Sequence, residues 1–162
     1  MNPLIKRILV YIDGTEAGST ASLGAVILAR SIQAELHALY VINTRALSDL
    51  VKTHIFLQSE EEEYHRDLEA DADRYLNFIK NTGLQKGLQV ITHKKSGTVH
   101  AEIKNIIAEI RADLLVIGEL SHIQSRRDQF YDEQERAMRI VNCPVLIIKD
   151  DDRIRDLYEQ LV

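Results

Sequence analysis

The residues best suited to chemistry lie where two apolar runs of the sequence end. Asp13, Gly14 and Thr15 follow the run RILVYI, and Gly118 ends the run DLLVIG. An acid after a buried strand has two interpretations: it caps the next helix, or it accepts a hydrogen bond from a ligand. The sequence leaves both open. A glycine such as Gly118 lets a main chain approach an anion closely.

Other reactive side chains give weaker patterns. His93 ends a predicted strand, His100 begins a predicted helix and His122 follows another predicted strand. All three are expected at one edge of the sheet, and three imidazoles can hold zinc. Their spacing matches no metal signature, so we expect no metal site. Ser121 lacks the strand-turn-helix glycine context of a catalytic nucleophile, and we expect no enzyme activity.

The elements that position these residues follow from hydrophobic patterning. Some runs are continuously apolar, which is typical of parallel strands buried on both faces. Helical periodicity lies between the runs, and Gly83 is a candidate C-cap after the second helical stretch. The predicted strands are residues 7–13, 35–42, 88–93, 113–118 and 143–149, and the predicted helices include residues 25–32, 68–79, 99–110 and 132–141.

This alternation predicts the fold class. Strands that alternate with helices indicate an α/β three-layer sandwich around a five-stranded parallel sheet. We expect the strand order 3-2-1-4-5, a flavodoxin-like or Rossmann-like arrangement with right-handed crossovers. Ligands of such sheets bind at the carboxyl ends of the strands, where Asp13 and Gly118 are expected.

Length and composition limit the alternatives. The chain has 162 residues, and its net charge of −5 argues against non-specific nucleic-acid binding. The single cysteine, Cys143, cannot form an internal disulfide. The longest uncharged run has 13 residues, too short for a membrane span. We therefore expect a cytoplasmic protein with one domain over residues 1–150 and an amphipathic tail over 151–162.

Two charged or amphipathic segments lie outside this core pattern. Residues 59–73 contain eight acids and one base, which is typical of a solvated helix face. The tail carries apolar residues at helical spacing, namely Ile154, Leu157, Tyr158 and Leu161. The tail is expected to dock on its own core or on a second subunit.

Taken in order, the segments KRILVYIDGTEAG, ELHALYVI, SGTVHAEI, DLLVIG and RIVNCPVLIIK resemble the universal stress protein family along residues 5–149. The resemblance implies an adenine nucleotide alpha hydrolase-like fold, a dimer and a stress-linked role. It also implies a candidate nucleotide site for ATP or AMP, formed by Asp13, Gly14, the main chain at Val41, Gly97 and Gly118.

The chain departs from the glycine-rich pattern of the nucleotide-binding members. In those members a G-x-x-G motif is followed by nine residues and then by glycine and serine or threonine. Counted from Gly118, these later positions fall on Ser121, Tyr131 and Asp132. Asp132 places a carboxylate where a phosphate would sit. Asp132 and Glu135 also have the spacing of a capping box.

We therefore expect a stress-response or signalling protein with a degenerate nucleotide site, acting through dimerisation and an unidentified protein partner. The alternative is an ATP- or AMP-binding member in which Arg126 and Arg127 replace the glycine loop. The same two arginines are also compatible with a solvated loop. The dimer is expected through the apolar edge strand from Pro144 to Ile148, because free strand edges are usually covered. The tail is a second possible dimer contact.

Overall fold

The computed structural model of the protein describes residues 3–44, 48, 52–53, 58–120 and 133–162. Its centre is a five-stranded sheet in the order β3-β2-β1-β4-β5, in which each neighbouring pair is parallel. The predicted α/β class and strand order are therefore confirmed. The strands are β1 (Arg7–Ile12), β2 (Glu35–Asn43), β3 (Val90–Gly97), β4 (Leu114–Gly118) and β5 (Val145–Ile148).

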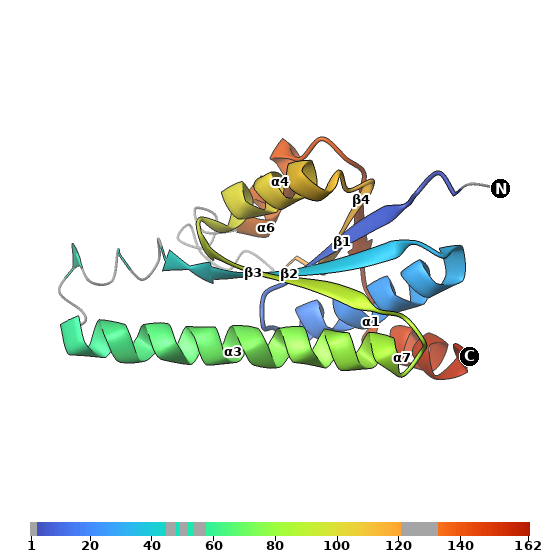
Figure 1. The fold of residues 1–162 in the computed structure, drawn as a ribbon, viewed down its shortest axis with the longest axis horizontal. Helices are drawn as coiled ribbons and strands as arrows, with labels where there is room; N and C mark the ends of the chain where they lie inside the picture. Colours follow the sequence, from blue (N-terminus) through green and yellow to red (C-terminus); the bar gives the residue numbers. More distant parts are fainter. Residues whose placement is uncertain (1–2, 45–47, 49–51, 54–57, 121–132) are drawn as a thin grey trace.

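Helices cover both faces of the sheet (Figure 1). One layer contains α1 (Glu16–Ile32), α3 (Gln58–Leu84) and α7 (Asp151–Gln160), and the other contains α4 (Val99–Ile110) and α6 (Glu133–Ile140). Each layer has its own apolar core against the sheet. Among the described residues, no helix is long and apolar enough to cross a bilayer.

The central strands are buried on both faces because helices lie above and below them. Ile8 and Val10 of β1 pack in the core under α1 and α3, whereas Leu9 and Tyr11 pack in the core under α4. β4 is buried along its whole length. Continuous apolar runs therefore correspond to central strands, as parallel-sheet architecture requires.

The third strand begins and ends later than predicted. It was expected over residues 88–93, but β3 continues through Lys94 and Lys95 to Gly97. β3 is an edge strand with several exposed side chains, so polar residues do not interrupt it. His93 therefore lies in the middle of the strand and not at its carboxyl end.

The predicted C-cap at Gly83 is wrong. α3 continues to Leu84, and Gly83 lies within the helix with its backbone against the next strand. A Cβ at this position would lie 2.6 Å from Cγ2 of Val90 and 2.8 Å from the carbonyl oxygen of Leu88. The glycine is therefore required for close packing and not for helix termination.

The acidic segment and the tail both form helices. The acidic residues lie toward the N-terminal end of α3, from Glu60 to Asp73. Glu60 and Glu61 are in its first turn, where the helix dipole favours carboxylates. The tail forms α7, which packs on its own chain. The Asp151 carboxylate accepts from the Thr20 hydroxyl at 2.7 Å, and Tyr158 packs against the core under α1 and α3.

Candidate functional site

The carboxyl edge of the sheet brings together the predicted site residues that the structure describes. Asp13 and Gly14 follow β1, Gly97 ends β3, and Gly118 ends β4. Val41 lies inside β2, with its side chain buried in the core under α4 and its Cα in register with that of Lys95. Strand order therefore gathers segments far apart in sequence at one edge.

Asp13 has hydrogen-bond partners on both carboxylate oxygens. Its Oδ1 accepts from the main-chain N–H of Thr15 at 3.0 Å and from the Thr15 hydroxyl at 2.5 Å. Its Oδ2 accepts from Nε2 of Gln134 at 2.6 Å. Thr15 is the N-cap of α1, and its Oγ1 accepts from the Gly18 N–H at 3.2 Å. Asp13 therefore orients the residue that caps α1.

The glycines at this edge have local structural roles. Gly118 lies so close to α1 that a Cβ there would be 2.5 Å from the carbonyl oxygen of Ala17. Gly14 has a φ of +82°, which glycine adopts without strain. These two glycines are required for the main-chain path, whether or not a ligand binds beside them.

The N-terminus of α4 carries a carboxylate from α6. Oε2 of Glu133 lies 2.5 Å from Nδ1 of His100 and accepts from the main-chain N–H of His100 at 3.1 Å. The preceding N-cap, Thr98, makes no side-chain cap bond. Glu133 thus occupies a position at the helix N-terminus that favours an anion.

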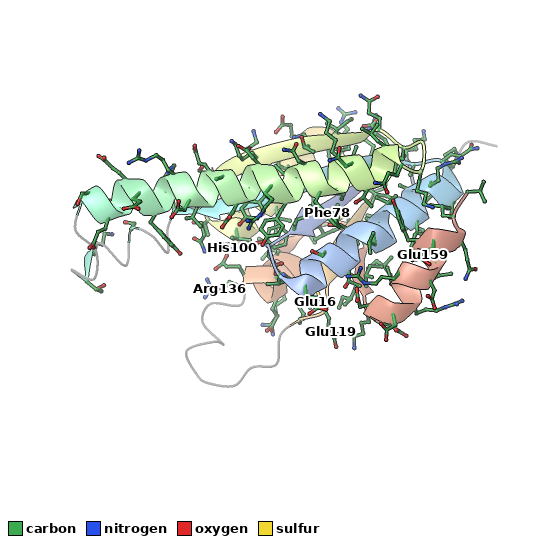
Figure 2. The ribbon with its side chains drawn as sticks, turned by 90° about the horizontal axis from the view of Figure 1, so that it is seen from below. Glu16, Phe78, His100, Glu119, Arg136 and Glu159 are labelled. Atoms are coloured by element: carbon green, nitrogen blue, oxygen red, sulfur yellow. The ribbon has the colours of Figure 1, made fainter. Side chains whose placement is uncertain are left out.

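The first turn of α6 therefore closes the edge from two sides. Glu133 binds the start of α4, and Gln134 binds Asp13 after β1. The Oε1 atom of Gln134 is buried and has no hydrogen-bond partner among the described residues. Figure 2 shows His100 and Arg136 toward the end of the molecule where Glu16 begins α1, while Glu159 lies away from them on α7.

Among the described residues of this edge, two carboxylates act on a buried phenol. Burial raises the pKa of Tyr11, and the nearby charges of Asp13 and Glu133 raise it further. The two carboxylates therefore act on the same phenol, which stays protonated at neutral pH. A guanidinium also approaches, because Nη1 of Arg136 lies 3.7 Å from Oε1 of Glu133. Arg136 pairs with one of the two carboxylates.

Several predicted positions lie outside the described residues. These are Arg126 and Arg127 of the alternative anion site, His122 of the histidine set, and the three positions of the degenerate motif, Ser121, Tyr131 and Asp132. Of the other histidines in that set, His100 pairs with Glu133, and His93 contacts His37 of β2. Within the described ranges, no three His, Cys, Asp or Glu side chains are grouped as metal ligands.

Sequence reasoning did not find the residues that contact Asp13 and the start of α4. Glu133 and Gln134 are adjacent polar residues in the first turn of a short helix, a common pattern. Their partners lie more than 30 residues away in the sequence, so spacing gives no signal for them. The strand order places β1 beside β4, and α6 is the next described helix after β4. This order brings α6 near the end of β1, where Asp13 lies, and it makes the contact between Gln134 and Asp13 predictable.

A parallel sheet in this order, with an acid and glycines at its carboxyl edge, defines a Rossmann-like α/β protein. The sequence model described as the universal stress protein family matches residues 4–149. The chain belongs to the universal stress protein family. The matched residues end before α7 begins at Asp151.

Individual proteins support this membership. Universal stress protein MJ0531 of Methanocaldococcus jannaschii is 25% identical over 146 residues, covering 90% of this chain and 83% of the relative. A universal stress protein family structure from Burkholderia pseudomallei has a TM-score of 0.70 at 21% identity, covering 93% of this chain and 100% of that chain. An Arabidopsis thaliana family structure with AMP bound has a TM-score of 0.62 at 17% identity, covering 91% and 94%.

Proposed function

We propose that this universal stress protein acts through protein contacts and binds adenine nucleotides weakly or not at all. The observation that carries the proposal is the engagement of both Asp13 oxygens within the chain, by Thr15 and by Gln134. A ligand that hydrogen-bonds Asp13 would have to displace one of these donors. Displacing Gln134 would leave its partly buried amide N–H without this bond, which costs about 1–3 kcal/mol.

Charge at the same edge supports the proposal. Glu133 places a carboxylate at the α4 N-terminus, which would otherwise favour a phosphate. A like charge about 4 Å from a phosphate costs about 4 kcal/mol at an effective dielectric of about 20. Halved for solvent screening, this penalty still weakens binding roughly 30-fold.

The alternative is an AMP- or ATP-binding member that uses Asp13, the main chain at Val41 and the two arginines Arg126 and Arg127. The Arabidopsis relative with AMP bound favours this alternative, because the two folds agree over most of both chains. In that case the nucleotide would have to compete with Gln134 for Asp13 and with Glu133 for the helix N-terminus.

One measurement separates the two candidates. The purified full chain is denatured, and the supernatant is assayed for adenine nucleotide by absorbance and mass. ATP and AMP are then titrated into the native protein by calorimetry. We expect no copurified nucleotide and a dissociation constant weaker than about 30 μM. Copurified nucleotide or submicromolar binding contradicts the proposal and supports the arginine alternative.

We further propose a cytoplasmic homodimer that pairs through the outer edge of β5, which is paired with no other described strand. β5 is the last strand of the sheet order, and Leu146 at its centre is 37% exposed. Unpaired edges of this kind are usually covered, and a twofold contact covers both copies. The tail stays a second predicted contact of the dimer, and Asp151 and Tyr158 of α7 also bind their own chain.

A further inference from the structure

A chain of three polar side chains crosses the face of the sheet under α4, away from the carboxyl edge. Glu35 and His37 lie on β2, and His93 lies on the neighbouring edge strand β3. Nε2 of His37 is 2.5 Å from Oε1 of Glu35, and Nδ1 of His37 is 2.8 Å from Nε2 of His93. The two ring planes differ by 14°. His37 is only 5% exposed, so water cannot replace these contacts easily.

The carboxylate determines where the protons lie. The ionised carboxylate of Glu35 can only accept, so Nε2 of His37 must carry a hydrogen. A neutral His37 then offers a lone pair at Nδ1, and Nε2 of His93 must donate to it. The structure thus requires the Nε2–H form of both rings when the pair is uncharged.

The pair responds differently to a first and a second proton. One added proton can sit on the outer Nδ1 of His93, and Nε2 of His93 then still donates to Nδ1 of His37. The proton can also sit on Nδ1 of His37 if His93 moves its own hydrogen to its outer Nδ1 and accepts with Nε2. The bond between the rings survives in both arrangements. With two added protons, both facing nitrogens carry hydrogens. The bond is then lost, and two cations lie against each other, one of them on the buried ring of His37.

The charges around the pair are mixed. Glu35 carries an ion pair with Arg7 of β1, whose Nε lies 3.8 Å from Oε1. Burial lowers the pKa of His93, and His37 and Lys95 of β3 lower it further, while Glu109 of α4 acts in the opposite direction. The surroundings therefore do not neutralise a second positive charge.

We propose that His37 and His93 form an acid-sensitive latch that adds to the main-chain pairing of the edge strand β3 with β2 at neutral pH. The latch opens and loosens β3 when both rings are protonated. The latch is distinct from the candidate nucleotide edge, because His93 lies in the middle of its strand, in register with Leu39. The proposal does not depend on whether the chain binds nucleotide. It gives a universal stress protein a direct structural response to acidification.

Nuclear magnetic resonance of the full wild-type chain tests the latch. Long-range nitrogen correlations should show the Nε2–H form of both rings near pH 7.5, and two coupled titration steps on acidification. Amide protection factors in β3 should fall roughly tenfold more than those in β1 as the pH is lowered from about pH 7 through the second titration step. Independent single-step titration of the two rings, or equal changes in β1 and β3, would overturn the proposal.

A matched variant sharpens the test. In His93→Gln the amide can still donate to Nδ1 of His37, but it does not titrate. Protection of β3 should stay within about twofold of wild type near pH 7.5 and should no longer fall on acidification. His65→Gln on α3 serves as the control and should retain the wild-type acid response. Acid release that persists in His93→Gln contradicts the latch, and if this variant does not fold, the wild-type measurement alone decides.

Discussion

Gln134 and Asp13 lie 121 residues apart in the sequence, and Nε2 of Gln134 donates to Oδ2 of Asp13 across 2.6 Å. The contact ties the first turn of α6 to the end of β1. The carboxylate of the adjacent residue, Glu133, instead accepts from the main-chain N–H of His100 in the first turn of α4. One helix turn therefore supplies two groups that occupy the carboxyl edge of the sheet.

Removing these two groups should allow nucleotide binding. We expect the double variant Glu133→Gln, Gln134→Ala to bind ATP about 10- to 30-fold more tightly than the wild type, because a carboxylate is neutralised and Oδ2 of Asp13 is freed. Calorimetric titration measures the change.

The control for this experiment is Glu135→Gln. Glu135 lies on the same helix and pairs with Arg139, so its variant removes a charge of the same sign without freeing Asp13. An equal gain in the control would show that net charge, and not the occupied edge, weakens binding. No gain in the folded double variant would show that other groups close the edge.

The carboxylate of Asp113 should stabilise the fold in a pH-dependent way. Its Oδ2 accepts from the main-chain N–H groups of Lys6 at 2.8 Å and Arg7 at 3.0 Å, and these bonds lower the pKa of Asp113. A carboxyl with a lowered folded-state pKa stabilises the protein above its unfolded-state value of about 3.9. The contribution is lost as the pH falls through the folded-state pKa. Asp113→Ala should therefore lose about 1 kcal/mol of unfolding free energy at neutral pH.

Urea unfolding of both proteins at about pH 7 and about pH 3 checks the sign. The difference between wild type and Asp113→Ala should shrink at the lower pH. Asp113→Asn keeps a neutral acceptor and should lose less at neutral pH. A deficit of the alanine variant that is the same at both pH values would show that charge has no part in the effect.

The hydroxyl of Tyr158 should anchor α7 to the rest of the chain. It donates to the carbonyl oxygen of Thr82 at 2.8 Å and lies 3.2 Å from Oε1 of Gln85. Tyr158→Phe should lower the unfolding free energy by about 1 kcal/mol, because the buried carbonyl loses a donor. Thermal unfolding monitors the loss, with Glu159→Gln on the same helix as the control. Equal melting temperatures for wild type and Tyr158→Phe would show that apolar packing alone holds α7.

The edge of β5 should mediate the homodimer. Leu146→Lys places a charge on that edge and should convert the dimer to a monomer in sedimentation experiments at tens of micromolar. Ile91→Lys on the opposite edge strand is the matched control, because Ile91 is 40% exposed and Leu146 is 37% exposed. A monomeric wild type, or dissociation by Ile91→Lys instead, contradicts the proposed interface.

Much of the fold is predictable because burial on two faces leaves a clear pattern in the sequence. The apolar runs of β1 and β4 identify the central strands and hence the strand order. The end of β3 was predicted wrongly because an edge strand tolerates Lys94 and Lys95, which look like a turn in sequence. The role of Gly83 was predicted wrongly because the sequence does not distinguish a glycine required for close packing from a glycine that ends a helix.

The candidate site was only partly predictable. An acid and glycines after buried strands mark the edge of a parallel sheet, so Asp13, Gly14 and Gly118 could be placed there. The partners of Asp13 could not be identified, because a glutamine in a helix turn gives no sign of what it contacts. Whether the predicted site residues bind a ligand remains a prediction, and Arg126 and Arg127 lie outside the described residues.

The length of α3 has a consequence for the rotational motion of the molecule. Its 27 residues span about 40 Å, and it lies along the longest dimension of the protein (Figure 1). Helical N–H bonds are nearly parallel to the helix axis, so those of α3 are aligned with the slowest-tumbling direction. Their nitrogen spins should therefore relax with a higher ratio of longitudinal to transverse relaxation times than those of amides perpendicular to this axis. This anisotropy would identify the orientation of α3 in solution without a crystal.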